Sequence, residues 1–155
     1  MTNTERNKRL AREWYALIGS ARYDEARAYV SDDFEFYPMI DERLEGVDAF
    51  IRLESSHMDP QPGFHFELLN VIDEGDYVAV HFIHEGDLPD AVNTFLGLKA
   101  EKKHSHHDVM TWLQFNEEGK ICKKWAKYNM FYVLRELGVP EIVALDEKMR
   151  AAQPQ

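Results

Sequence analysis

Residues 104–115, HSHHDVMTWLQF, and residues 120–131, KICKKWAKYNMF, are separated by the turn sequence NEEG. This arrangement predicts an antiparallel β-hairpin, because two strand-like segments flank a short turn that contains glycine. Side chains alternate between the two faces of a strand, so Ile121, Trp125 and Asn129 are expected to point the same way. If that face lines a cavity, the cavity contains an indole and a primary amide.

The first segment of this hairpin has two faces of different character. One face comprises His107, Val109, Thr111, Leu113 and Phe115. The other comprises His104, His106, Asp108, Met110, Trp112 and Gln114. The first face is more apolar, so we expect it to form the wall of a pocket, and a single β-bulge would reverse this assignment.

Helical patterns dominate the first part of the chain and strand patterns dominate the second. The spacing of apolar residues predicts helices over residues 4–18, 23–30 and 46–58, a short strand over 34–38, and a hairpin over 64–87 that turns at Glu74-Gly75-Asp76. Residues 88–103 carry no readable pattern. A short helix is expected over residues 131–137, and a further helical extension from about residue 139, with Pro140 in its first turn. This order predicts one α+β domain over residues 1–155, with the helices on one face of the sheet.

Composition and charge limit the partners of the chain. The formal net charge of −10 repels phosphate backbones, so we expect no nucleic-acid partner. The apolar runs are far shorter than the roughly 20 residues that cross a bilayer, so we expect no membrane span. The polar residues 1–14 lack the apolar stretch of a secretory signal, and the single cysteine, Cys122, cannot form an internal disulfide. A cytoplasmic protein with a small hydrophobic partner is therefore expected.

Several segments of the chain, in this order and spacing, resemble one known family. They are EWYALIGSARYDEARAYVSDDFEFYP, LEGVDAF, VIDEGDYVAVHF, GKICKKWAKYN and LRELGV. The chain is similar over residues 7–139 to the SnoaL-like polyketide cyclases of the nuclear transport factor 2-like superfamily. The resemblance implies a cone, in which N-terminal helices pack on the concave face of a strongly bent antiparallel sheet and an apolar pocket opens at the mouth. It also implies a homodimer that forms through the outer face of the sheet.

The resemblance places an unusual residue at the position of the usual catalytic acid. In the cyclases, an acidic residue at the end of the strand that corresponds to GKICKKWAKYN acts as general acid and base for an intramolecular aldol closure. That position is Asn129 here, and an amide cannot exchange a proton near neutral pH. The proton chemistry must then come from another residue.

His107 is the expected acid or base, because an imidazole titrates near its ordinary pKa of about 6.5 and needs only modest tuning. Tyr37 stands where family members often carry a polar ring, so Tyr37 and Asn129 are expected to hold the substrate oxygen. The alternatives are a half-buried histidine bonded to a backbone carbonyl and a core tyrosine with its hydroxyl at the surface. Further ligand contacts are expected from Trp14, Tyr15, Thr111, Leu113 and Trp125.

The opposite face of residues 104–115 has two possible roles, a metal site or a dimer contact. His104, His106 and Asp108 have side chains that suit zinc or iron, but no third or fourth ligand from another strand is identifiable. Met110 and Trp112 on the same face need to be covered, which favours a dimer contact there. We therefore expect no metal and no cofactor.

These residues predict a cofactor-independent cyclase, isomerase or dehydratase that acts on a small hydrophobic carbonyl compound by general acid/base catalysis. The alternative is a non-catalytic protein of the same fold that binds a small hydrophobic ligand. A third and weaker alternative is a fold that serves protein association alone.

Overall fold

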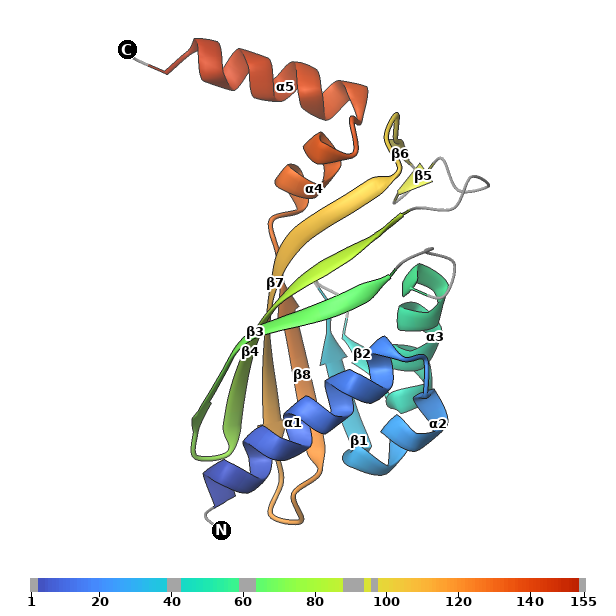
Figure 1. The fold of residues 1–155 in the computed structure, drawn as a ribbon, viewed down its shortest axis with the longest axis vertical. Helices are drawn as coiled ribbons and strands as arrows, with labels where there is room; N and C mark the ends of the chain where they lie inside the picture. Colours follow the sequence, from blue (N-terminus) through green and yellow to red (C-terminus); the bar gives the residue numbers. More distant parts are fainter. Residues whose placement is uncertain (1–2, 39–42, 59–63, 88–93, 96–97, 154–155) are drawn as a thin grey trace.

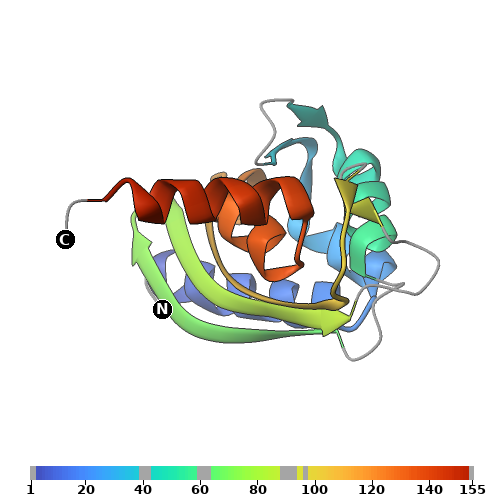
Figure 2. The ribbon, with the colours of Figure 1, turned by 90° about the horizontal axis from the view of Figure 1, so that it is seen from above.

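The computed structural model of the chain describes residues 3–38, 43–58, 64–87, 94–95 and 98–153. It is an α+β fold in which one strongly curved sheet partly encloses the N-terminal helices, as Figures 1 and 2 show from two directions. The predicted fold class and the packing of these helices on the concave face are confirmed. No helix in the described residues is long and apolar enough to cross a membrane.

The main sheet has six strands in the order β2-β1-β8-β7-β4-β3. The strands are β1 (Val30–Tyr37), β2 (Leu44–Glu45), β3 (His65–Glu74), β4 (Tyr77–Asp87), β7 (His104–Phe115) and β8 (Ile121–Lys127). Neighbouring strands are antiparallel except β1 and β8, which are parallel. The expectation of an entirely antiparallel sheet is therefore wrong at one pair, because the chain passes through α3 and the strands β2 to β7 before β8 returns beside β1.

The helices form two groups around this sheet, α1 to α3 in one and α4 with α5 in the other (Figure 1). They are α1 (Asn3–Gly19), α2 (Tyr23–Ala26) with the 3₁₀ turn η1 (Arg27–Tyr29), α3 (Val47–Met58), α4 (Met130–Glu136) and α5 (Pro140–Ala151). The helix predicted over residues 23–30 ends early, because Val30 already pairs with Ile121 of the sheet. Within residues 88–103, two short strands form a separate hairpin, β5 (Thr94–Phe95) and β6 (Leu98–Lys99).

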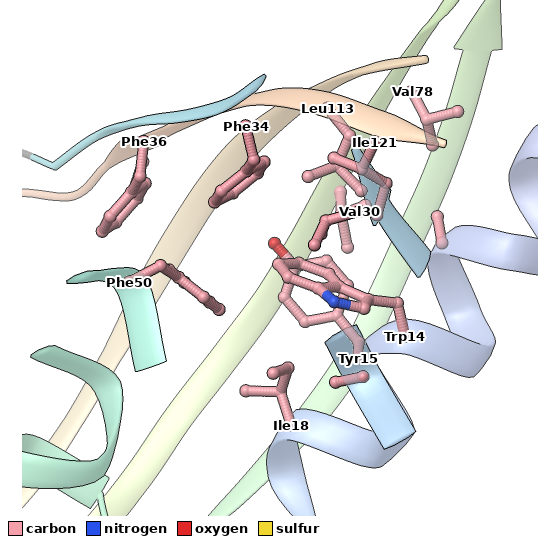
Figure 3. Packing of buried hydrophobic residues seen from close by; sticks show 14 of the residues in the cluster. Trp14, Tyr15, Ile18, Val30, Phe34, Phe36, Phe50, Val78, Leu113 and Ile121 are labelled. Atoms are coloured by element: carbon pink, nitrogen blue, oxygen red, sulfur yellow. The ribbon is translucent and has the colours of Figure 1, made fainter. Parts of the chain in front are cut away.

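The main core lies between α1, α3 and the concave face of the sheet (Figure 3). On α1, Ala11, Trp14, Tyr15 and Ile18 recur at three- and four-residue spacing, which places them on one side of the helix. From α3, Phe50 inserts between this side and the sheet, and its ring stacks on Trp14 with centroids 5.4 Å apart. This contact packs α3 against α1 on the concave side of the sheet.

A second, smaller core packs the C-terminal helices against β6 and the segment that follows it. Its buried members are Ala100, Val133, Leu134, Leu137 and Val139. Helix α5 buries none of its residues and extends away from the body in Figure 1. The helical extension predicted from about residue 139 is confirmed as this helix.

A β-bulge in β8 changes the face on which its side chains lie. Phe115 of β7 pairs with Ile121, but the preceding Gln114 pairs with Lys123, so β8 has one extra residue at Cys122. After the bulge, Lys124 and Ala126 face inward and are buried. The expectation that Ile121, Trp125 and Asn129 share one face is wrong for this reason.

The faces of β7 follow the predicted assignment. From Ser105 to Leu113, buried residues alternate strictly with exposed ones. His107 and Thr111 lie on the concave side, whereas His106 and Asp108 are exposed on the outer side. The bulge lies on the neighbouring strand, so it leaves the alternation of β7 intact.

Candidate functional site

Polar side chains gather on the concave side of β7 and β8. In the described part of the chain, the buried polar side chains are those of Asn7, Ser105, His107, Thr111 and Lys124. Four of these belong to the two central strands, so the middle of the sheet carries the polar chemistry of an otherwise apolar interior. Buried polar groups are costly unless they are bonded, so their partners define what this region can do.

Lys124 is the centre of this polar group. Its Nζ lies 3.1 Å from Oε1 of Glu54, which projects from α3, and only 5% of the Lys124 side chain is exposed. Four aromatic rings surround the same nitrogen, with centroids at 4.5 Å (Phe50), 4.8 Å (Phe36), 5.3 Å (Trp14) and 5.8 Å (Tyr15). An ammonium is stabilised at ring faces within about 6 Å, so the rings and Glu54 together hold one buried cation.

Burial and the Glu54 carboxylate act on Lys124 in opposite directions. Removal from water disfavours the charged form, so burial lowers the pKa of the Lys124 ammonium, and the Coulombic field and hydrogen bond of Glu54 raise it. The effect of burial is the larger, and the pKa falls below its ordinary value of 10.5. The proton that Lys124 and Glu54 share is therefore less firmly held by the amine than in water.

A second buried pair lies next to Lys124. Tyr15 Oη of α1 and Thr111 Oγ1 of β7 are 2.5 Å apart, and either hydroxyl can donate to the other. Burial raises the pKa of Tyr15 far above its ordinary range, so the phenol stays protonated. This pair ties α1 to the central strand and keeps a hydroxyl dipole beside the buried cation.

His107 lies further along the concave side of β7. Its Nδ1 is 3.1 Å from Ser105 Oγ, and its ring lies 4.7 Å from His84 and 5.2 Å from Tyr128, measured between centroids. Burial first, and then the neighbouring imidazoles His84 and His106, lower the pKa of His107 to about 3. The expectation of an imidazole that titrates near 6.5 is therefore wrong, because the ring is removed from water beside other imidazoles.

Tyr128, which follows β8, lies beside His107 and belongs to the same polar group. Burial, with a smaller contribution from the Glu54 carboxylate, raises the pKa of Tyr128 to about 12. Its phenol is therefore protonated over the physiological range and can donate a hydrogen bond. Half-buried His84 and Tyr128, with Glu54, lie where the buried interior meets the surface.

Two predicted site residues, Tyr37 and Trp125, lie on the outer face of the sheet. The rings of Tyr37 and Trp125 stack on each other at 5.3 Å between centroids, and Tyr37 Oη donates to Glu35 at 2.7 Å. Trp125 pairs with Trp112 of β7, so this stack is on the outer face of the sheet. The expectation that Tyr37 and Trp125 reach the pocket is contradicted by this placement. The bulge at Cys122 turns Trp125 outward, whereas Tyr37 alternates on β1 with the buried Phe36 and therefore faces outward beside Trp125.

Asn129 has a structural partner of its own. Its Oδ1 accepts the backbone N–H of Tyr132 at 3.0 Å, and this bond caps the N-terminus of α4. It lines, with His106, His107, Asp108 and Tyr132, a hollow of about 300 Å³ beside α4. His107 reaches this hollow from the concave side, and the residues that line the hollow do not include the aromatic rings around Lys124.

The other predicted ligand contacts lie in the packed core. Trp14, Tyr15, Thr111 and Leu113 are each at most 2% exposed. Tyr15 and Thr111 are bonded to each other, and Trp14 contacts the Lys124 ammonium. A direct contact of any of the four with a ligand stays a prediction.

Glu54, Lys124, His84 and Tyr128 were not singled out by the sequence analysis. The spacing of Val47, Phe50 and Glu54 along α3 did contain a signal, because residues three and four apart share one face of a helix. Lys124 had no such signal, because strand alternation without the bulge places it on the outer face. Among the described residues, no group of three or more His, Cys, Asp or Glu side chains could hold a metal ion.

The curved sheet with helices on its concave face is shared with several solved structures. A candidate SnoaL-like polyketide cyclase from Jannaschia sp. CCS1 superposes with a TM-score of 0.78 at 17% identity, over 90% of this chain and 96% of that one. A candidate polyketide cyclase from Xanthomonas campestris gives 0.72 at 18% identity, over 88% and 100%. An epoxide hydrolase of M. tuberculosis, similar to LEH, gives 0.67 at 15% identity, over 95% and 99%.

These similarities define the class of fold. The sequence pattern of the SnoaL-like domain matches residues 11–124, and the chain belongs to this family. The comparison with curated protein sequences gives no match.

Proposed function

We propose that the protein is a cofactor-independent enzyme that moves a proton next to the carbonyl group of a small hydrophobic, polyketide-like compound. The observation that carries this proposal is the buried pair of Lys124 and Glu54 inside a wall of aromatic rings. Acid/base chemistry beside a carbonyl needs a proton acceptor and a positive group for the developing enolate. The pair supplies both within 3.1 Å.

A purely structural role explains this pair poorly. Burying a charged group costs several kcal/mol per ion, and well-packed hydrophobic residues of similar volume are often as stable or more stable. A costly polar pair in the middle of an aromatic core is typical of a site where function requires charge.

Each polar group has a distinct role in the proposal. The Glu54 carboxylate accepts the proton from the carbon next to the carbonyl, because its side chain is 17% exposed and reaches toward the surface. The Lys124 ammonium and the protonated Tyr128 phenol stabilise the enolate oxygen. His107, neutral with a pKa of about 3, acts as a hydrogen-bond partner and does not shuttle the proton.

The substrate class rests on the surroundings and on the similar proteins. The walls of the site are aromatic, which favours an apolar substrate. Proteins of the same fold are named polyketide cyclases, a ketosteroid isomerase and an epoxide hydrolase, all of which suggest small organic substrates. A cytoplasmic location stays a prediction.

Proton exchange tests this proposal directly. The protein is incubated with hydrophobic 1,3-diketones and enones in deuterated water, and the loss of the carbon-bound proton signal is followed by NMR. We expect the exchange rate to fall by about 10²–10⁴-fold in Glu54→Gln, the usual contribution of a positioned base. The matched control Glu117→Gln changes an exposed turn carboxylate and should keep the wild-type rate. Equal rates in wild type and a folded Glu54→Gln variant would contradict the proposal.

A non-catalytic binding protein is the second candidate. It is favoured by Asn129, which the resemblance places at the position of the acidic residue of the cyclases and which caps a helix. Native mass spectrometry that finds a co-purified hydrophobic ligand, together with no proton exchange on any carbonyl compound, would support binding over catalysis.

We also propose a homodimer that forms through the outer face of the sheet. Ile72, Ala79, Trp112, Trp125 and Tyr37 are in register across five strands. Ile72 is 66% exposed and Trp112 is 44% exposed, so this row leaves an apolar surface on the protomer.

Light scattering after size-exclusion chromatography tests the homodimer. Trp112→Lys is expected to convert the dimer to a monomer, because a charge would be buried at the centre of the contact. Glu117→Lys, in an exposed turn, should leave the mass unchanged. A monomeric wild-type protein would contradict the proposed dimer.

A further inference from the structure

We propose that Lys124 acts as a nucleophile and forms an imine with the carbonyl carbon of the substrate. This inference rests on the proposed function, because it concerns the same site and the same class of substrate. It goes further by assigning a covalent intermediate to the site. Lys124 then serves as the electron sink of the reaction as well as a source of charge.

The surroundings of Lys124 suit an imine. In the described part of the chain it is the buried lysine, and all other described lysines are partly or fully exposed. The rings of Phe50, Phe36 and Trp14 enclose its Nζ within 5.3 Å and keep water away from that atom. An imine hydrolyses in water, so a dry aromatic enclosure extends its lifetime.

The partner of Lys124 can remove the proton that blocks its lone pair. Glu54 Oε1 lies 3.1 Å from Nζ, which is hydrogen-bond distance. Burial lowers the pKa of the ammonium, so transfer of one proton to Glu54 costs less than it would in water. Lysines that are desolvated in hydrophobic pockets are activated for Schiff-base formation in this way.

The atoms and charges of the step balance within the pair. Glu54 takes one proton from Lys124, and the neutral amine attacks the carbonyl carbon, so that a C–N bond forms and the carbonyl π electrons move to oxygen. A proton passes from nitrogen to that oxygen through Glu54, which gives a carbinolamine. Glu54 then protonates the hydroxyl, the C–O bond breaks, water leaves, and a protonated imine forms beside the Glu54 carboxylate.

The protonated imine activates the neighbouring carbon. Its positive nitrogen withdraws electrons from the adjacent C–H bond, and Glu54 takes that proton to form an enamine. No oxidant or reductant is needed. A guanidinium in place of the amine would keep the charge and the pair with Glu54 but could not form the C–N bond.

Reductive trapping tests this inference. The protein is incubated with 4-phenylbutan-2-one and sodium cyanoborohydride, and the adduct is located by peptide mass mapping. We expect one adduct on Lys124, formed faster than on any surface lysine, because burial lowers the pKa of its ammonium and leaves more of the amine neutral. Lys124→Arg should abolish the adduct, whereas Lys148→Arg on exposed α5 should keep it.

The outcomes separate the two proposals. An adduct spread over surface lysines, or no adduct on Lys124 of the wild-type protein, overturns the imine even if Lys124→Arg fails to fold. Proton exchange that persists in Lys124→Arg also overturns the imine, and leaves the proposed acid/base function in place. A wild-type protein with neither exchange nor adduct overturns both.

Discussion

Glu54→Gln is expected to lower the free energy of unfolding by about 3 kcal/mol near neutral pH, because it leaves the buried Lys124 ammonium without its counter-charge. We place the effect at the low end of the range for a broken buried pair, since Glu54 is 17% exposed and its carboxylate is partly solvated. The measurement is equilibrium unfolding in urea. Glu117→Gln, which removes a solvated carboxylate, should change the free energy by less than about 0.5 kcal/mol.

A double-mutant cycle isolates the interaction energy between Lys124 and Glu54 from the effects of their surroundings. Lys124→Met removes the charge and keeps most of the volume, so the double variant Lys124→Met with Glu54→Gln should be more stable than Glu54→Gln alone. The destabilisation by Glu54→Gln should also shrink as the pH rises toward 10, because Lys124 then loses its proton in the folded state at little cost. Single-variant effects that simply add would show that Lys124 and Glu54 do not interact.

The second large effect is a pH dependence of stability that originates at His107. Its pKa is about 3 in the folded protein, against 6.5 for an unperturbed imidazole. Between these values the unfolded chain binds a proton that the folded protein does not, so acid favours unfolding. The contribution of neutral His107 to the free energy of unfolding is fully present above pH 6.5. It falls by up to about 1.4 kcal/mol per pH unit as the pH decreases toward 3, and it does not change further below pH 3.

Between pH 6.5 and 3, the effect of His107 lowers the free energy of unfolding by about 3 to 5 kcal/mol in total. Other groups also titrate there, so the measurement is the difference between wild type and His107→Gln, an uncharged side chain that can still bond to Ser105. The slope should flatten between pH 6.5 and 3 in this variant. Identical slopes in wild type and His107→Gln would mean that the imidazole is solvated in the folded state.

Both predictions concern groups whose behaviour depends on distant parts of the chain. Glu54 and Lys124 are 70 residues apart in the sequence, and neither has a local partner that could mark it as half of a pair. The imidazole of His107 is displaced from its ordinary pKa by burial and by His84 across the β4–β7 ladder. The sequence indicated which face of β7 is apolar, and therefore that His107 is inside, but not that its environment would keep it neutral.

The sequence around Asn129 contains a local signal for a helix cap. Asn is a preferred N-cap residue, and a helix was expected to begin two residues later. Read in that way, Asn129 is a helix cap, and the structure shows this role through its bond to Tyr132.

The sequence by itself determined the type and order of the main elements, the hairpin turns, the α+β class and the inward face of β7, because these depend on periodicity and turn chemistry within a few residues. Only the tertiary structure decided which side chains meet inside the cone. One extra residue at Cys122 turns Lys124 inward and Trp125 outward, and it does so because β8 must match β7 on one side and the parallel β1 on the other. A strand bulge is stabilised by neighbours that are distant in sequence, so local alternation cannot reveal it.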